Sequence, residues 1–277
     1  MLYLIMLRRT SLYTALTVAL MTTFLLMSFA ILQYVPFEQG QEALLIRTPR
    51  LTTDTWAVFD PASGDVRYGS NIETTRPIAS ITKLFTAYMV MHSEAIETKT
   101  TITWEDVNTE GEFGKLTYGE ELTLGALLFP LLIESSNDAG TAITRTLGPL
   151  YTEAVGGTVD VLGLADTDIV DGTGLSKNDV SSPRDLAKFF SLVRAEYPHI
   201  TDITQLRMHI SGKRGLMNNN PARSLKGFTG GKQGYTPEAG KTFVGTFSLA
   251  SGREVGIVLL GSEDLTLDIQ KILDSLR

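Results

Sequence analysis

The sequence contains no cysteine and only three histidines. Without thiols, the chain cannot form disulfides, bind an iron–sulfur cluster or a zinc ion through thiolates, or use a cysteine nucleophile. The histidines, His92, His199 and His209, show neither His-x-His nor His-Glu-x-x-His spacing, so the sequence predicts no metal site. The sequence also lacks a Gly-x-Ser-x-Gly elbow, which leaves a lipase-like catalytic triad without support.

Positive charge is scarce as well. The 24 Lys and Arg residues are outnumbered by 31 Asp and Glu residues, which gives a formal net charge of -7 and a pI near 5.1. A nucleic-acid surface needs clustered Lys and Arg to neutralise phosphates, so nucleic acid is not an expected partner. We recognise no cofactor-binding motif and expect no cofactor. A chain of 277 residues with 43% hydrophobic residues can bury one sizeable core.

One long stretch near the N-terminus carries no charge at all. It runs from Thr10 to Phe37, directly after Arg8 and Arg9. A helix that crosses a bilayer needs about 20 apolar residues, and the segment Leu12–Leu32 supplies about that number. The two arginines favour a cytoplasmic N-terminus, because positive residues accumulate on that side. We therefore predict a single N-terminal transmembrane helix.

A cleaved signal peptide is the alternative for this segment. Ser28-Phe29-Ala30 has the small-x-small form of a cleavage site, but the uncharged stretch is longer than the roughly 7 to 15 residues of a signal core. The sequence is accordingly divided into an anchor or signal segment, a tether and a domain, over residues 1–37, 38–53 and 54–277. We expect this domain on the extracytoplasmic side of the cell membrane, or secreted if the signal is cleaved.

The domain begins and ends with patterns typical of strands. Residues 56–59 and 65–68 flank the turn-forming segment Asp60–Gly64 and predict a hairpin. Three more strands are predicted over Phe228–Lys232, Thr242–Leu249 and Glu254–Leu260, and a closing helix over residues 264–276. One antiparallel sheet is therefore built from both ends of the domain.

The middle of the domain is mostly helical. Apolar residues recur every three or four positions from Ser80 to His92, which predicts a helix with one buried stripe. Two helices are predicted within Leu122–Leu147, broken by Pro130 and by the polar residues 134–138. Another begins at Ser182-Pro183. We therefore predict an α+β fold in which helices flank the sheet and form a helical lobe, with a ligand cleft between the lobes.

Ser80-Ile81-Thr82-Lys83 is the only Ser-x-x-Lys in the sequence. On a helix, residues three apart project from one face with side-chain roots about 5 to 6 Å apart, so the lysine amine can contact the serine hydroxyl. A neutral lysine can activate a serine nucleophile, and burial or a second nearby cation favours that neutral form. A helix cap with a solvated lysine is the alternative for this motif taken alone.

A second polar cluster, Ser135-Ser136-Asn137, lies at the break in the apolar helical stretch. Its first hydroxyl could relay protons, and the asparagine amide could hold a substrate carbonyl because it both donates and accepts. An ordinary helix cap is the alternative. Ser176-Lys177-Asn178 has the same spacing, but it lies in the Gly- and Asp-rich segment Asp171–Asp179 and is interpreted as a loop.

A third cluster, Lys232-Gln233-Gly234, lies on a predicted strand within Gly230–Thr236. Glycine in a strand allows close approach of another backbone, so a substrate strand could lie along it. Lys232 would lower the pKa of Lys83 and attract a substrate carboxylate. Lys213-Arg214-Gly215 competes with this motif but is interpreted as a loop.

Taken in order, Ser80-x-x-Lys83, Ser135-x-Asn137 and Lys232-x-Gly234 resemble the motif set of penicillin-binding proteins and class A β-lactamases. The surrounding residues look more closely like low-molecular-mass D-alanyl-D-alanine carboxypeptidases and endopeptidases. The similar segments are Ala79–Lys83, Glu134–Ala139, Gly174–Ala187 and Gly231–Gly240. The resemblance extends over nearly all of residues 54–277.

This resemblance implies a β-lactamase/transpeptidase-like fold and a serine-type D-alanyl-D-alanine carboxypeptidase or endopeptidase. Its expected partners are peptidoglycan stem peptides, β-lactams as inhibitors and, through the N-terminal helix, the membrane. The resemblance assigns Ser80 as nucleophile, Lys83 as base and Ser135 as the group that passes a proton to the leaving amine. It assigns oxyanion binding to the backbone N–H groups of Ser80 and Tyr235. The implied substrate-binding residues are Asn137, Lys232, Gln233, Gly234, Tyr235 and Thr236.

Two residues depart from the family pattern. Gln233 replaces a threonine whose hydroxyl ordinarily helps to bind the terminal carboxylate, and this change favours endopeptidase over carboxypeptidase action. Ser136 replaces a frequent glycine, from which we expect little effect.

Two other functions fit part of the pattern. A class A β-lactamase needs a deacylating glutamate in a Glu-x-x-Leu-Asn loop, and residues 150–185 contain no such sequence. A non-catalytic peptidoglycan-binding relative would be consistent with Gln233. It is disfavoured because Ser80, Lys83, Ser135 and Asn137 are all retained.

Overall fold

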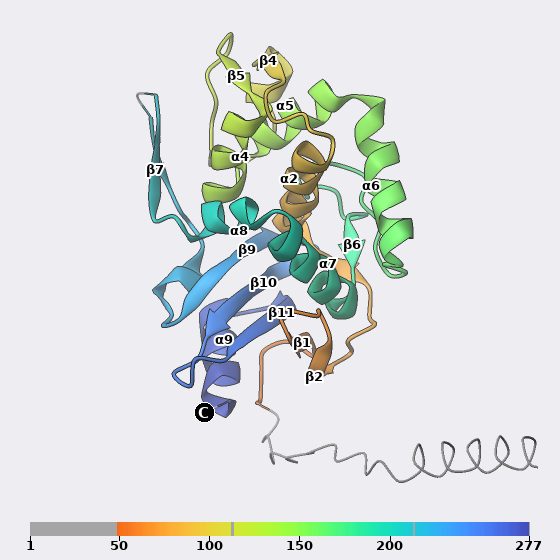
Figure 1. The fold of residues 1–277 in the computed structure, drawn as a ribbon, viewed down its shortest axis with the longest axis vertical. Coiled ribbons are helices and arrows are strands. Elements are labelled where there is room, and N and C mark those ends of the chain that lie inside the picture. The colour runs from red at the N-terminus through yellow and green to blue at the C-terminus, as the bar shows by residue number, and fades with distance from the viewer. Residues whose placement is uncertain (1–48, 112–113, 213, 277) are drawn as a thin grey trace, which may run out of the picture. The chain divides into compact units, whose positions relative to one another are not determined.

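The computed structural model describes residues 49–111, 114–212 and 214–276 (Figure 1). The predicted anchor, residues 1–37, and the tether up to residue 48 lie outside these ranges. Within the described ranges, no helix has the length and apolar character needed to cross a bilayer. Thr52 and Thr53 already belong to the folded domain, because their hydroxyls donate to Asp268 Oδ2 and to the Leu260 carbonyl.

A five-stranded antiparallel sheet forms one side of the domain, with strand order β2-β1-β11-β10-β9. As predicted, the first two strands come from the start of the domain and the other three from its end. Their bounds are Thr55–Phe59 (β1), Val66–Ser70 (β2), Phe228–Thr236 (β9), Gly240–Ser248 (β10) and Glu254–Ser262 (β11). Strand β9 therefore lies at an edge of this sheet and, among the described strands, pairs with β10 alone.

Both faces of the sheet are covered by helices, because successive side chains of a strand point to opposite faces. On β1, Trp56 and Val58 belong to the hydrophobic cluster that includes the C-terminal helix α9 (Leu265–Ser275). Ala57 and Phe59 belong to the main cluster, shared with the helical lobe.

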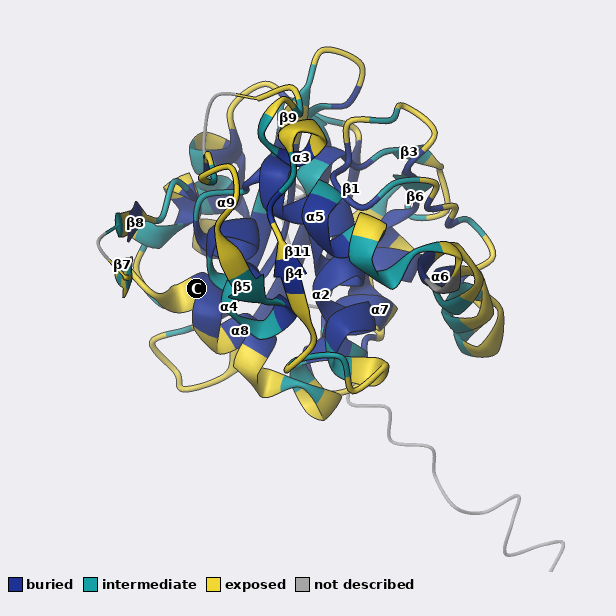
Figure 2. Ribbon diagram, turned by 90° about the horizontal axis from the view of Figure 1, so that it is seen from above, coloured by how far each residue is buried: buried dark blue, intermediate teal, exposed yellow. Residues whose placement is uncertain are grey.

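The helical lobe is built around α2, which is almost entirely buried (Figure 2). In chain order its helices are α2 (Thr82–His92), α3 (Trp104–Val107), α4 (Leu124–Ile133), α5 (Asn137–Leu147), α6 (Pro149–Leu162), α7 (Pro183–Glu196) and α8 (Pro198–Gln205). Short 3₁₀ turns, η1 (Ala79–Ile81) and η2 (Pro221–Ser224), precede α2 and β9. The predicted α+β architecture is confirmed.

Two local predictions are wrong. Pro130 does not break the helix but lies inside α4, because burial of the flanking leucines outweighs the cost of a proline near the helix end. The only break in this stretch is the polar one before α5. Arg214 and Gly215 were expected in a loop, but they form strand β8 (Arg214–Met217), which pairs with β7 (Met208–Ser211) in a projecting hairpin (Figure 1).

Two smaller strand pairs complete the described fold. Strands β3 (Arg76–Pro77) and β6 (Val180–Ser181) pair beside the turn η1, and β4 (Lys99–Thr101) pairs with β5 (Glu121–Thr123) at the rim of the helical lobe.

Candidate active site

Ser80 lies on the 3₁₀ turn η1, immediately before the first turn of α2. The residue before it, Ala79, has a φ of 49°, in the left-handed region that side chains other than glycine rarely adopt. Such strain costs of order 1–3 kcal/mol and is concentrated at functional sites. The Ser-x-x-Lys spacing acts as predicted, since Lys83 Nζ is 2.9 Å from Ser80 Oγ.

The Lys83 amine is fully buried and contacts three oxygen atoms. Besides Ser80 Oγ, it donates to Asn137 Oδ1 at 2.7 Å and to the Thr173 carbonyl. Both of these oxygens can only accept. In the neutral amine, they take the two N–H groups and leave the nitrogen lone pair directed at the serine hydroxyl. The geometry thus orients Lys83 to accept the proton of Ser80.

Burial is the main cause that lowers the pKa of Lys83, to about 7. The carboxylates of Asp171 and Asp179 oppose this shift. Near neutral pH a large fraction of Lys83 is therefore uncharged, as a general base requires. The sequence predicted that Lys232 would help to lower this pKa, but desolvation of the amine is sufficient.

Ser135 and Asn137 lie at the junction of α4 and α5. Ser135 has a φ of 61° and is the second strained residue of the site. Ser136 caps α5 by accepting a hydrogen bond from Ala139 N at 3.1 Å. The side chain of Asn137 is held at both ends, because its Nδ2 donates to the Glu110 carbonyl at 2.6 Å while its Oδ1 accepts from Lys83.

Lys232, on β9, connects the sheet to this junction. Its buried amine donates to Ser135 Oγ at 2.8 Å and to the Gln233 carbonyl at 2.8 Å. Burial, together with the nearby Lys83 amine, lowers the pKa of Lys232 well below its usual value. A substrate carboxylate beside Lys232 would favour its charged form.

Gly234 brings β9 against the turn η1, which carries Ser80. A Cβ atom at this position would lie 2.6 Å from Ser80 N and 3.0 Å from Ala79 Cβ, so only glycine permits this approach. The backbone N–H of Ser80 therefore lies beside the edge strand that carries the N–H of Tyr235. The three motifs, far apart in sequence, meet around the Ser80 hydroxyl.

The family model for D-alanyl-D-alanine carboxypeptidase, peptidase family S11, matches residues 43–263. The chain belongs to this family. A D-alanyl-D-alanine endopeptidase from Pseudomonas aeruginosa is 28% identical over 239 residues, which cover 82% of this chain and 76% of the relative. The expected identity, a serine D-alanyl-D-alanine peptidase, is thus confirmed at the level of the family.

Solved structures agree with this assignment. A D-alanyl-D-alanine carboxypeptidase from Mycobacterium tuberculosis H37Rv has 25% identity and a TM-score of 0.75, covering 82% of this chain and 91% of that chain. Penicillin-binding protein D2 from Listeria monocytogenes, solved in its cefotaxime-bound form, has 24% identity and a TM-score of 0.72, covering 82% and 96%. Its likeness shows the fold alone.

Gln233, Tyr235 and Thr236 are the other substrate-binding residues that the resemblance predicted on β9. Gln233 and Tyr235 alternate with Lys232 and Gly234 along β9, and they line a cavity of about 310 Å³ that also includes Lys241 and Asp264. Thr236 Oγ1 accepts a hydrogen bond from Ala239 N at 3.1 Å and so supports the turn between β9 and β10.

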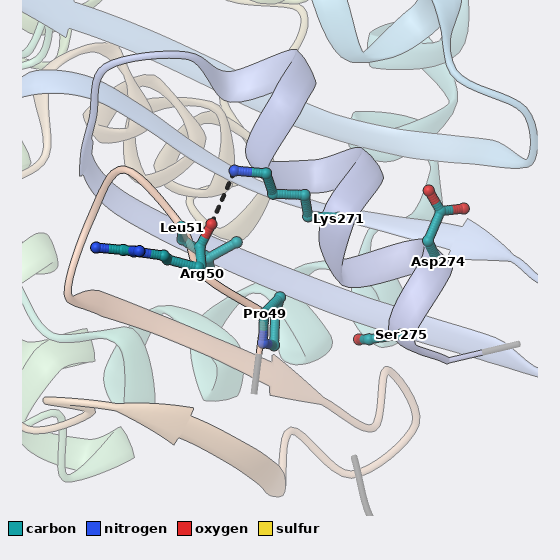
Figure 3. A pocket seen from close by; sticks show the side chains of 6 residues that line it. All are labelled: Pro49, Arg50, Leu51, Lys271, Asp274 and Ser275. Carbon is teal, nitrogen blue, oxygen red and sulfur yellow. Dashed lines mark hydrogen bonds between the residues drawn. The ribbon is translucent and has the colours of Figure 1, made fainter. Parts of the chain in front are cut away.

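A cavity of about 560 Å³ lies away from the three motifs. It lies between the start of the described chain and α9, where Lys271 donates to the Arg50 carbonyl at 2.8 Å (Figure 3). None of the predicted site residues lines it.

Sequence reasoning missed the residues that lie behind Lys83. Asp171, Thr173 and Asp179 belong to the segment that was interpreted as a loop. The loop assignment is correct, but the loop contacts the buried amine of Lys83. Its closely spaced Asp, Gly and Thr residues were the available signal for a tightly hydrogen-bonded turn.

Proposed function

We propose that this chain cleaves D-alanyl peptide bonds in peptidoglycan stem peptides through an acyl-enzyme on Ser80. The observation that carries the proposal is the contact of a buried amine, Lys83 Nζ, with the Ser80 hydroxyl at 2.9 Å in a member of the S11 family. Labelling with a fluorescent penicillin, followed by mass spectrometry of the modified peptide, tests it directly. Attachment anywhere other than Ser80 contradicts it.

Acylation follows from the geometry around Lys83. Ser80 Oγ attacks the carbonyl carbon of the D-alanyl bond while its proton passes to the lone pair of Lys83. Negative charge then develops on the carbonyl oxygen, which we place between the N–H groups of Ser80 and Tyr235. Donors of this kind typically contribute about 3 kcal/mol each to the transition state.

The attack gives a tetrahedral intermediate, and its collapse breaks the C–N bond. The leaving amine needs a proton, and Ser135 passes it on: the Ser135 hydroxyl, which accepts from Lys232, gives its proton to the amine and regains the proton that Lys83 took from Ser80, so that Lys83 is neutral again. Asn137 holds the substrate backbone through its amide. Water then hydrolyses the ester on Ser80, with Lys83 again acting as the base. β-Lactams inhibit by acylating the same hydroxyl.

Gln233 suggests a preference for internal bonds over terminal ones. We propose that the chain favours endopeptidase action, because a neutral amide replaces the short hydroxyl that helps to bind a terminal carboxylate. The Pseudomonas relative carries the endopeptidase name.

Gln233→Thr is expected to increase release of terminal D-Ala by about tenfold, the contribution of one hydrogen bond to a charged group. Cleavage of cross-linked dimers should change little, because a cross-linked D-Ala does not present a free carboxylate. Rates on both substrates, measured on the same preparation, give the comparison. An unchanged rate of terminal D-Ala release counts against this preference.

We also propose that residues 1–37 anchor the chain in the cell membrane and place the domain outside the cytoplasm. The uncharged stretch from Thr10 to Phe37, preceded by two arginines, supports this proposal. Membrane fractionation and intact-mass measurement of the full-length protein test it. We expect a detergent-dependent protein that retains its N-terminus, whereas a soluble chain beginning near Ile31 would indicate cleavage.

A further inference from the structure

Two carboxylates, the fully buried Asp179 and the half-buried Asp171, lie behind the catalytic lysine, outside the three motifs. Asp179 is fully buried, and its Oδ1 accepts from the backbone N–H groups of Val170 and Asp171 at 2.7 and 3.1 Å. Its Oδ2 accepts from Thr82 Oγ1, on the first turn of α2, at 3.2 Å. The catalytic helix and the segment that begins at Asp171 are thus joined through Asp179.

Asp171 organises the turn that follows it. Its Oδ1 accepts from Thr173 N, Thr173 Oγ1 and Gly174 N at 2.6, 2.9 and 2.7 Å, and its Oδ2 accepts from Ser176 N at 2.8 Å. Four donors converge on one carboxylate, so the conformation of residues 171–176 depends on it. Removing this acceptor would leave several backbone N–H groups without a partner.

The turn contacts the catalytic groups at two points. The Thr173 carbonyl accepts from Lys83 Nζ. Gly174 has a φ of 82°, and a Cβ there would lie 2.0 Å from the Ala79 carbonyl oxygen and 2.9 Å from Ser80 N. The turn therefore packs directly against the strained backbone beside the nucleophile.

We infer that Asp171 is a positioning residue for the general base. Its carboxylate fixes the Thr173 carbonyl, which takes one N–H of Lys83 and keeps the lone pair directed at Ser80. Its negative charge also favours the protonated form of Lys83 and thereby sets the pH at which the base becomes available. The inference rests on the proposed acyl-enzyme chemistry at Ser80.

Four titratable groups surround the Lys83 amine. Lys232 on β9 repels its charged form, and Asp171 and Asp179 attract it. Tyr151 of α6 stays neutral, since burial raises the pKa of its hydroxyl. Burial, aided by Asp171, raises the pKa of Asp179 to about 7. Neutralising Asp171 therefore makes Asp179 easier to ionise, which returns part of the lost negative charge.

The test is the rate of acylation by a fluorescent penicillin, measured as a function of pH. This rate is constant at alkaline pH, the plateau, and falls at lower pH, the acidic limb, as Lys83 becomes protonated. To compare the limbs, the rates of each variant are divided by its own plateau rate, so that the folded fraction cancels. In Asp171→Asn, the acidic limb should move to lower pH, because an anion that favours protonated Lys83 is gone. The double variant Asp171→Asn/Asp179→Asn should move it further. The plateau rate should fall roughly tenfold in Asp171→Asn, because the carbonyl that orients the amine is no longer fixed.

Thr173→Val separates position from charge. It removes one hydroxyl bond to Asp171 but keeps the carboxylate, so the plateau should fall while the acidic limb stays in place. Asp168→Asn is the matched control, because Asp168 is an exposed carboxylate on the same segment and its loss should change neither quantity.

The outcomes distinguish this inference from the proposed function. If the wild-type protein is not labelled at Ser80, the proposed function fails. If the wild type is labelled and the plateau rate of Asp171→Asn equals that of the wild type, the positioning role is overturned, and if the acidic limb of Asp171→Asn coincides with that of the wild type, the effect of its charge is overturned. A limb that coincides in Asp171→Asn but moves in Thr173→Val overturns it as well.

Discussion

Ser80→Ala is expected to abolish covalent labelling by penicillin and to lower peptidase activity by a factor on the order of 10⁵ or more, as loss of the nucleophile does in other serine peptidases. The fold should persist, since Ser80 is half-buried and its contact with Lys83 is the only side-chain hydrogen bond recorded for it in the described structure. Intact mass after incubation with penicillin measures the acyl-enzyme, and hydrolysis of D-Ala-terminated peptides measures activity.

Ser93→Ala is a suitable control for this experiment. Ser93 lies at the end of α2 opposite to Ser80, where its hydroxyl donates to the Met89 carbonyl at 2.6 Å. It should label like the wild type. Labelling that survives in Ser80→Ala would mean that another residue carries the acyl group. The assignment of all three motifs to the active site would then fail.

The persistence of the label separates a peptidase from a β-lactamase. Residues 150–185 lack the Glu-x-x-Leu-Asn sequence of the class A enzymes. The carboxylates that the structure does place nearby, Asp171 and Asp179, are occupied by backbone and threonine donors. We therefore expect slow loss of the penicilloyl group from Ser80, and rapid turnover of penicillin would favour the alternative.

The sheet and the three motifs were predictable because each is specified by nearby residues. Short runs of apolar and β-branched residues bounded by turn residues mark the strands β1, β10 and β11, and a period of three to four marks α2. The spacing of Ser80 and Lys83 alone brings their side chains together on one helical turn.

Long-range contacts were less accessible to sequence reasoning. The Thr173 carbonyl lies 90 residues from Lys83 in sequence, and a backbone acceptor leaves no trace in residue type. The β7–β8 hairpin was missed because its strands are only four residues long and the basic sequence Lys213-Arg214 is typical of a loop. At Pro130, the rule that proline breaks a helix gave a wrong prediction, because burial of the neighbouring side chains outweighs it.

Lys83→Met should remove the general base while preserving the volume of the buried side chain. We expect the acylation rate to fall by roughly 10²- to 10⁴-fold. We also expect the remaining rate to lose its acidic limb, which in the wild type reflects the Lys83 pKa of about 7. Lys188→Met, an exposed lysine on α7, controls for the lost charge and should behave like the wild type.

Lys83→Met should also reveal how much the buried Lys83 amine lowers the free energy of unfolding. Because burial lowers the folded-state pKa of Lys83 from 10.5 to about 7, the unfolded chain binds one more proton than the folded chain between these two values. The free energy of unfolding is therefore highest above the unfolded-state pKa of Lys83 and decreases as the pH falls towards 7. Between pH 7.5 and 9.5, the free energy of unfolding of the wild type should therefore rise relative to Lys83→Met by about 1.4 kcal/mol per pH unit.

Urea denaturation of both proteins at several pH values within this window measures the difference directly, and other titrating groups largely cancel in it. Parallel curves would mean that Lys83 is charged in the folded protein near neutral pH. It could then not accept the proton of Ser80, and the base would have to be sought elsewhere. A rising difference together with lost acylation would show that one buried amine both weakens the fold at low pH and activates the nucleophile, as expected where function requires an uncharged lysine.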